Sequence, residues 1–252
     1  MQCSRLFDLR NYPRTFLLLV ACILLCIPAY FSIDFAKFWA VTSNLSYLVP
    51  LIISLEVKQY LLAVTIFIVF MISSFYHACA TYGACIYNKE DSTYIDVMFS
   101  WLLLYTLASY AAFRKNFVVL IPVHFLVIIL THEAQCDKDK LGFDCEVIRI
   151  LVVSIYFAFL FVQNITNKMK NLDITDTVVG LILFGIAVFF YMKSHGQDLK
   201  IVYGNHALWH TLGAAAASVI LTIYKDCEVH LFGWKEKCTV EETKSLVRAD
   251  VY

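Results

Sequence analysis

The sequence contains little charge, little glycine and little proline. Charged residues make up 16% of the 252 residues, whereas a soluble globular domain has about 25%. The 8 glycines and 4 prolines are too few for collagen-like, low-complexity or linker-rich architectures. These shortages exclude an ordinary soluble domain and indicate a chain built mostly of regular elements.

The sequence also lacks an excess of basic residues. The 20 lysines and arginines are balanced by 20 acidic residues, so the formal net charge is zero. Without a basic stripe, nucleic acid is not expected as a partner. A glycine-rich phosphate loop and a G-x-S-x-G elbow are both missing from the sequence, which argues against a P-loop NTPase and against an α/β-type serine hydrolase.

Long apolar runs are what the sequence does have, and 60% of its residues are hydrophobic. The first run extends from Thr15 to about Ile33 behind an arginine-containing N-terminus. It predicts a signal peptide or, as the favoured interpretation, an uncleaved signal anchor within residues 1–38. Seven further runs of membrane-spanning length follow, at 39–56, 59–79, 94–113, 116–131, 147–163, 175–192 and 203–224.

The expected fold class is therefore all-α: a polytopic membrane protein with seven transmembrane helices in residues 39–224 and a cytoplasmic tail at 225–252. Lysine and arginine favour one orientation, because cytoplasmic loops are enriched in them. If the first of the seven helices starts outside, the inward loops and tail carry most of the basic residues, among them Lys58, Arg114, Lys115, Lys168, Lys170 and Arg248.

Cysteine positions favour the same orientation. Cys79 and Cys85 lie near one predicted outward loop, and Cys136 and Cys145 lie in another. Cysteines on the outer or lumenal side can form disulfides, and the sequence leaves all three pairings open. We therefore expect a plasma-membrane or secretory-pathway protein whose C-terminus is cytoplasmic.

Five polar residues interrupt three of the apolar runs: Ser73 and His77, Asp96, and His206 with His210. Each four-residue spacing places two side chains on one helix face, one turn apart. In the predicted topology all five lie near the outer ends of their helices, and so at one membrane depth. A single intramembrane histidine would be explained as well by an interhelical contact, but three imidazoles with an open position are the ligand set of a catalytic zinc site.

The pattern S-x3-H, then Asp, then H-x3-H resembles the CREST superfamily of seven-helix membrane proteins. Within it the sequence is most similar to the transmembrane protein 8 family over about residues 39–224. The resemblance implies that Zn²⁺ is held by His77, His206 and His210, that Asp96 is a general base, and that Ser73 stabilises an oxyanion or steadies the attacking water. The likeness is carried by Phe75-Tyr76-His77-Ala78-Cys79, Thr42-Ser43-Asn44-Leu45-Ser46-Tyr47-Leu48-Val49-Pro50 and His206-Ala207-Leu208-Trp209-His210.

The resemblance implies a zinc-dependent, phospholipase A2-like hydrolase of a membrane lipid. Its substrate would be an acyl ester of a GPI or a glycerophospholipid, attacked by a water whose pKa the metal lowers from about 16 to about 7. An alkaline-ceramidase-like amide hydrolase and a non-enzymatic, myomaker-like fusion or receptor protein with a structural zinc remain as alternatives. The presence of both Ser73 and Asp96 favours hydrolysis, because myomaker looks to lack this serine and aspartate. Of the other histidines, His124 is expected in packing or facing a pore, and His132, His195 and His230 in loops or the tail.

Overall fold

The computed structural model describes residues 27–113, 118–133, 174–194 and 198–223, together with residues 24, 151–156, 158–159 and 162. This part of the chain is helical apart from short turns and contains no strand, which confirms the predicted all-α class. In chain order its named helices are η1 (Ile27–Tyr30), α2 (Ile33–Thr42), η2 (Ser43–Tyr47), α3 (Leu48–Glu56), α4 (Tyr60–Tyr82), α5 (Lys89–Phe113), α6 (Ile121–Glu133), α9 (Ile174–Lys193) and α10 (Leu199–Leu221).

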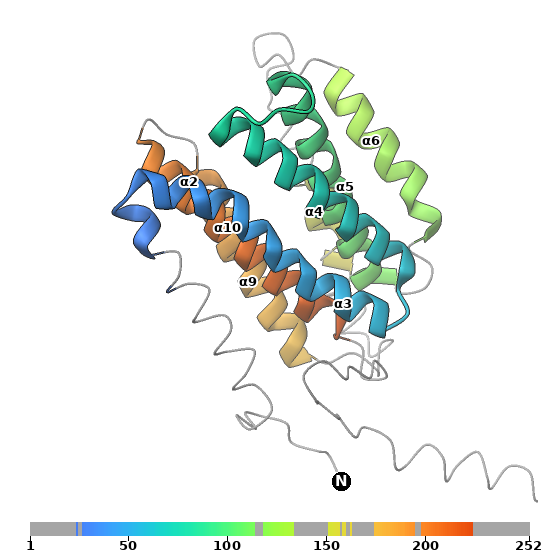
Figure 1. Ribbon diagram of the computed structural model, residues 1–252. Coiled ribbons are helices and arrows are strands. Elements are labelled where there is room, and N and C mark those ends of the chain that lie inside the picture. The colour runs from blue at the N-terminus through green and yellow to red at the C-terminus, as the bar shows by residue number, and fades with distance from the viewer. Residues whose placement is uncertain are drawn as a thin grey trace, which may run out of the picture.

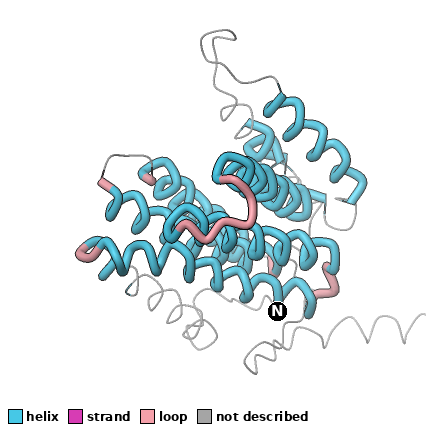
Figure 2. The backbone as a smooth tube through the Cα atoms, turned by 45° about the horizontal axis from the view of Figure 1, so that its top comes forward, coloured by secondary structure: helices cyan, strands magenta, loops and turns pink. Residues whose placement is uncertain are grey.

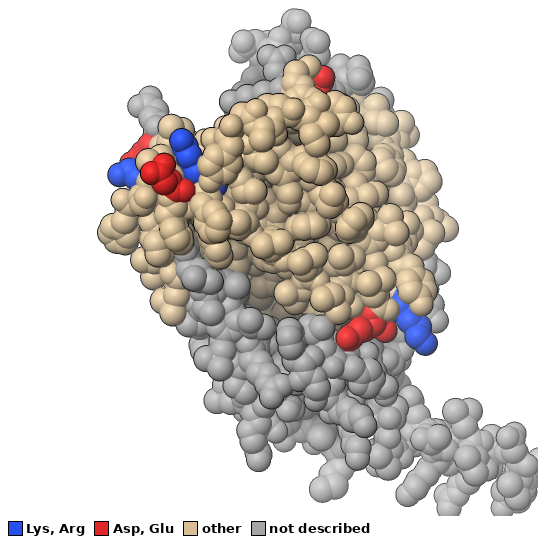
Figure 3. Space-filling view, in the orientation of Figure 1, with Lys and Arg blue, Asp and Glu red and all other residues tan. Residues whose placement is uncertain are grey.

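Four helical stretches are long and apolar enough to cross a membrane: Ile33–Glu56, Tyr60–Tyr82, Asp91–Phe113 and Asp176–Lys193. The described surface fits this assignment. In the view of Figure 3 its charged side chains gather at opposite ends of the molecule, and the broad band between them is uncharged. An apolar band flanked by charge is the surface that a protein presents to a bilayer. These features indicate an integral membrane protein.

The other three predicted spans have different outcomes. The run 116–131 yields α6, whose apolar stretch is shorter than the four candidate membrane spans. The run 147–163 falls largely outside the described residues. The run 203–224 yields α10, which has 23 residues but is interrupted by polar and small side chains and is not one of the four apolar spans. Seven crossings therefore stay a prediction.

Helix α10 lies at the centre of the bundle. The α2–η2–α3 stretch runs along it, α9 packs against it, α4 pairs with α5, and α6 lies on the outer side of α5 (Figure 1). Figure 2 shows the described part of the chain, tilted by 45°, as helices joined by short loops. Many buried residues of α10 are small, including Ala207, Ala214, Ala216 and Ala217. Small residues let neighbouring helices approach closely, so α10 contacts α2, η2, α3, α5 and α9.

The N-terminal part of the described chain is built into this bundle. Helix α2 begins at Ile33, after the N-cap Ser32, so the predicted domain division at residue 39 passes through a helix. Asp34 lies in the first turn of α2, where a carboxylate is favourable. Residues 1–23 lie outside the described part, and the signal-peptide or signal-anchor assignment stays a prediction.

The first apolar stretch is interrupted by the 3-10 turn η2. Three polar side chains of this turn donate to backbone carbonyls nearby: Ser43 Oγ to Ala40 O at 3.3 Å, Asn44 Nδ2 to Val41 O at 3.1 Å, and Ser46 Oγ to Ser43 O at 2.6 Å. Such local bonds compete with regular α-helical geometry. The turn thereby places the polar residues of this apolar stretch beside α10.

Helix α4 ends at a left-handed glycine. Gly83 has φ 71° and its N–H donates to Cys79 O at 2.9 Å, which is a common way to end a helix. A disulfide joins Cys79 to Cys85 across this turn. The pairing that the sequence left open is thus assigned for these two cysteines, while Cys136 and Cys145 lie outside the described residues.

Candidate metal centre

Three histidines from two helices meet in the bundle. His77 comes from the C-terminal part of α4, and His206 and His210 come from successive turns of α10. One ring nitrogen from each lies within 4.8 Å of the other two. The ring centroids are 4.6 Å apart for His77 and His206, 4.9 Å for His77 and His210, and 4.6 Å for His206 and His210. The sequence prediction that these residues share one depth agrees with this geometry.

The spacing of the nitrogens suits a shared cation. His77 Nε2 and His206 Nε2 are 3.1 Å apart. Two nitrogens bound to one tetrahedral ion at about 2.0–2.1 Å are separated by about 3.3–3.4 Å. His77 and His210 are buried and His206 is half-buried, so the cluster is open on the His206 side. The group can hold a metal ion with a coordination position left over.

Asp96 and Ser73 form a pair beside this cluster. Ser73 lies one turn before His77 on α4, and its side chain lies close to the Asp96 carboxylate of α5. Asp96 is buried, and its Oδ1 has no hydrogen-bond partner among the described residues. An unsatisfied buried acceptor is unfavourable, so a donor from water or a ligand is expected at Oδ1. The two residues to which the resemblance assigns catalytic roles, Ser73 and Asp96, thus lie close together.

The turn η2 supplies three further residues that were not predicted as part of the site. Ser43 Oγ lies 3.3 Å from His210 Nδ1, and the Tyr47 ring centroid lies 6.0 Å from that of His210. Ser46 Oγ also approaches the carbonyl oxygen of His210 at 3.4 Å. The signal in the sequence was the run Ser43-Asn44-Leu45-Ser46 inside an apolar stretch, since intramembrane polar residues are rare without a partner.

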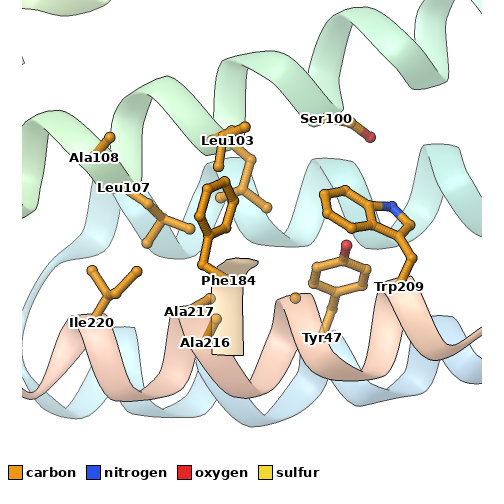
Figure 4. A pocket seen from close by; sticks show the side chains of 12 residues that line it. Tyr47, Ser100, Leu103, Leu107, Ala108, Phe184, Trp209, Ala216, Ala217 and Ile220 are labelled. Atoms are coloured by element: carbon orange, nitrogen blue, oxygen red, sulfur yellow. The ribbon is translucent and has the colours of Figure 1, made fainter. Parts of the chain in front are cut away.

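A mostly apolar cavity adjoins the site. Figure 4 shows Tyr47, Ser100 and Trp209 at one end of it and Leu107, Ala108 and Ile220 at the other. The first end is close to the histidines, because Tyr47 contacts His210 and Trp209 precedes it. Ser100 lies one turn after Asp96 on α5. Its volume is about 40 Å³, which is room for water-sized groups and not for a lipid chain.

The remaining histidines lie elsewhere. His124 of α6 is buried, and its Nε2 is 2.9 Å from the Tyr156 hydroxyl. Its ring also packs on Tyr105 of α5, with centroids 5.6 Å apart. This agrees with the packing role considered for it. His132 lies on the last turn of α6, and His195 and His230 lie outside the described residues.

Comparisons with known proteins place the chain in a family. A search of curated proteins finds no significant match. One family model, described as "Protein of unknown function (DUF3522)", matches residues 34–211. The match includes Ser43, the Ser73–Asp96 pair and all three histidines, and it covers well over half of the chain. The chain therefore belongs to the DUF3522 family.

Proposed function

We propose that this protein is a zinc-dependent hydrolase of membrane lipids. The observation that carries the proposal is a three-histidine group together with a buried carboxylate, Asp96, that lies close to Ser73, one turn of α4 from His77. A structural metal site needs ligands alone. A neighbouring carboxylate with an unsatisfied oxygen is the feature that a hydrolase requires, because the attacking water must lose a proton.

Zinc is the proposed metal because neutral imidazoles suit it, and because three protein ligands with an open position are typical of catalytic zinc. His77, His206 and His210 would hold it. When bound, zinc lowers the pKa of a coordinated water and polarises the carbonyl to be cleaved.

In this proposal the side chain of Asp96 carries out the proton transfers. Asp96 accepts a proton from the attacking water and later gives it to the leaving oxygen of the ester. The water oxygen bonds to the acyl carbon, the acyl carbon–oxygen bond breaks, and the products are a fatty acid and an alcohol. Ser73 lies close to the Asp96 carboxylate, and we assign it to orienting this carboxylate rather than to the oxyanion role that the resemblance implies.

The cavity beside the site has walls from η2, α5, α9 and α10 that are mostly hydrocarbon. Its volume of about 40 Å³ is well below the roughly 300–1,000 Å³ of ligand pockets, so a lipid chain would enter only if the helices moved apart. The substrate class therefore rests on the resemblance to the CREST superfamily and the transmembrane protein 8 family, which favours an acyl ester of a GPI or a glycerophospholipid. A ceramide amide remains the enzymatic alternative.

The proposed orientation places the site at the outer or lumenal side of a seven-helix protein with a cytoplasmic C-terminus. The Cys79–Cys85 disulfide lies at the end of α4 that is nearer to His77. Disulfides persist in the secretory pathway and outside the cell, which supports that side for this end of the bundle.

The test is hydrolysis of defined lipids by detergent-purified protein, with Asp96→Asn as the variant. We expect fatty-acid release from an ester-linked phospholipid or GPI, reduced by about 10²–10⁴-fold in Asp96→Asn with zinc content unchanged. His124→Gln, which alters a buried histidine outside the site, is the matched control and should keep its activity.

Two results would reject this proposal. Zinc-loaded, folded wild type that releases no acyl chain from ester or amide lipids would favour the structural-zinc alternative of a fusion or receptor protein. Equal activity of wild type and Asp96→Asn would remove Asp96 from the mechanism.

A further inference from the structure

The polar turn η2 contacts one metal-binding candidate directly. Ser43 is buried, with 3% of its surface exposed, and its Oγ lies 3.3 Å from His210 Nδ1. The same oxygen lies 3.3 Å from the carbonyl oxygen of Ala40. One hydroxyl thus lies between a backbone acceptor and an imidazole nitrogen.

The chemistry of these groups favours one direction for both bonds. A serine hydroxyl carries one proton and can accept through its lone pairs. The carbonyl of Ala40 can only accept, and it also receives Asn44 Nδ2 at 3.4 Å. When Ser43 donates to this carbonyl at 3.3 Å, Ser43 Oγ is the acceptor for His210, whose proton then lies on Nδ1.

This tautomer matters because of what it does to the other ring nitrogen. In a neutral imidazole with the proton on Nδ1, Nε2 has a free lone pair. The opposite tautomer would place an N–H on Nε2 and leave that nitrogen unable to bind a cation. Histidine ligands of metals almost always donate their second N–H to a carbonyl, carboxylate or water, and this bond sets the ring orientation.

We propose that Ser43 is a positioning residue of the metal centre, which holds His210 as the Nδ1–H tautomer and directs its Nε2 toward His77 and His206. This inference rests on the proposed function, since it presumes that the three histidines bind a metal. It adds a partner from the first apolar stretch to a site otherwise built from α4, α5 and α10. The 3-10 turn η2, which interrupts that stretch, places Ser43 next to His210.

The second contact of η2 agrees with this role. Ser46 Oγ lies 3.4 Å from the backbone carbonyl of His210 while donating to Ser43 O at 2.6 Å. The turn therefore contacts His210 through both its ring and its backbone. The ring contact is the one that decides which nitrogen can bind a metal.

The test compares Ser43→Ala with Ser54→Ala in zinc affinity, measured by competition with a chromophoric chelator on the full-length, detergent-purified protein. Ser54 is a matched control, because it is buried on the same apolar stretch and donates to Leu51 O at 2.7 Å. We expect Ser43→Ala to weaken zinc binding by about 10–100-fold and Ser54→Ala to leave it unchanged. Zinc-free samples of the two variants should melt at similar temperatures.

A double-mutant cycle separates positioning from a general effect on packing. In a His210→Ala background, Ser43→Ala should cause no further loss of zinc affinity, because the ring that it orients is gone. An equal loss in both backgrounds would overturn the inference. Nitrogen-15 NMR of the histidine rings in zinc-free wild type is an independent readout, and it should show His210 protonated on Nδ1; protonation on Nε2 would also overturn it.

These outcomes are distinguishable from failure of the proposed function. Wild type that binds no zinc would reject the hydrolase proposal itself. Wild type that binds zinc with the affinity of Ser43→Ala would reject only the role of Ser43.

Discussion

Tyr30 donates a hydrogen bond to Asn205 Oδ1 at 2.7 Å, across 175 positions of sequence. Asn205 in turn donates through Nδ2 to the carbonyl oxygen of Lys193 at 2.8 Å. These bonds join the segment before α2, the end of α9 and the start of α10, directly before His206. A polar contact next to the candidate metal centre therefore connects three separate parts of the chain.

Removing the Tyr30 hydroxyl should destabilise this junction. Tyr30→Phe keeps the ring but deletes the donor to a buried amide, and we expect a loss of about 1 kcal/mol in the free energy of unfolding. Thermal unfolding in detergent, followed by circular dichroism, measures it. Tyr60→Phe is the control, since Tyr60 is 62% exposed; equal melting temperatures of the two variants would contradict a stabilising role for the Tyr30 bond.

The ring of Tyr30 also explains why residue 204 of α10 is a glycine. A methyl group on Gly204 would lie 3.2 Å from the Tyr30 ring, whereas one on Gly185 of α9 would meet nothing within 4 Å. Gly204→Ala should therefore lower the melting temperature, while Gly185→Ala should raise it slightly, because alanine favours a helix over glycine by about 1 kcal/mol. Stabilisation by both substitutions would show that the Tyr30 ring does not constrain Gly204.

The Cys79–Cys85 disulfide should stabilise the end of α4 that carries His77. Closing so short a loop contributes about 2 kcal/mol by the chain-entropy estimate. Cys85→Ser, which changes an exposed position, should lower the melting temperature in the absence of reductant. A reducing agent should then lower that of wild type and leave the variant unaffected; a reductant effect of equal size in both would assign the stabilisation to other cysteines.

Filling the cavity should change the preferred acyl chain if lipid occupies it. Gly213 lines the cavity, and a methyl group there would meet nothing within 4 Å. Gly213→Leu should lower kcat/KM for long-chain esters more than for short-chain esters, because the larger side chain takes up space that a long chain needs. The control is Gly185→Leu, on an exposed part of α9; loss of activity independent of chain length in Gly213→Leu would argue against an acyl chain in this cavity.

Much of the site could be predicted from the sequence because its polar residues stand in apolar runs. In the structure Ser73 and His77 lie one turn apart on α4, and His206 and His210 lie one turn apart on α10. Ser43 was not predicted as part of the site, because a serine in an apolar stretch commonly packs between helices and its partner is 167 positions away.

Other features depend on tertiary structure that local patterns do not encode. The pairing of Cys79 with Cys85 follows from the turn at Gly83, and sequence alone left it open among four cysteines. The first of the seven helices is expected from the sequence to begin at residue 39, whereas α2 begins at Ile33 after the N-cap Ser32. The run 116–131 forms an apolar helix that is shorter than the four candidate membrane spans. The run 203–224 forms α10, many residues of which are buried against neighbouring helices.

The central claim is that His77, His206 and His210 bind zinc together. The most direct measurement is the metal content of detergent-purified protein by inductively coupled plasma mass spectrometry, wild type beside a His206→Ala/His210→Ala double variant. The account predicts about one zinc per chain in wild type, as for a single three-histidine site, and none in the double variant. Folded wild type without zinc after incubation with the metal, or a double variant that keeps its full zinc content, would contradict it.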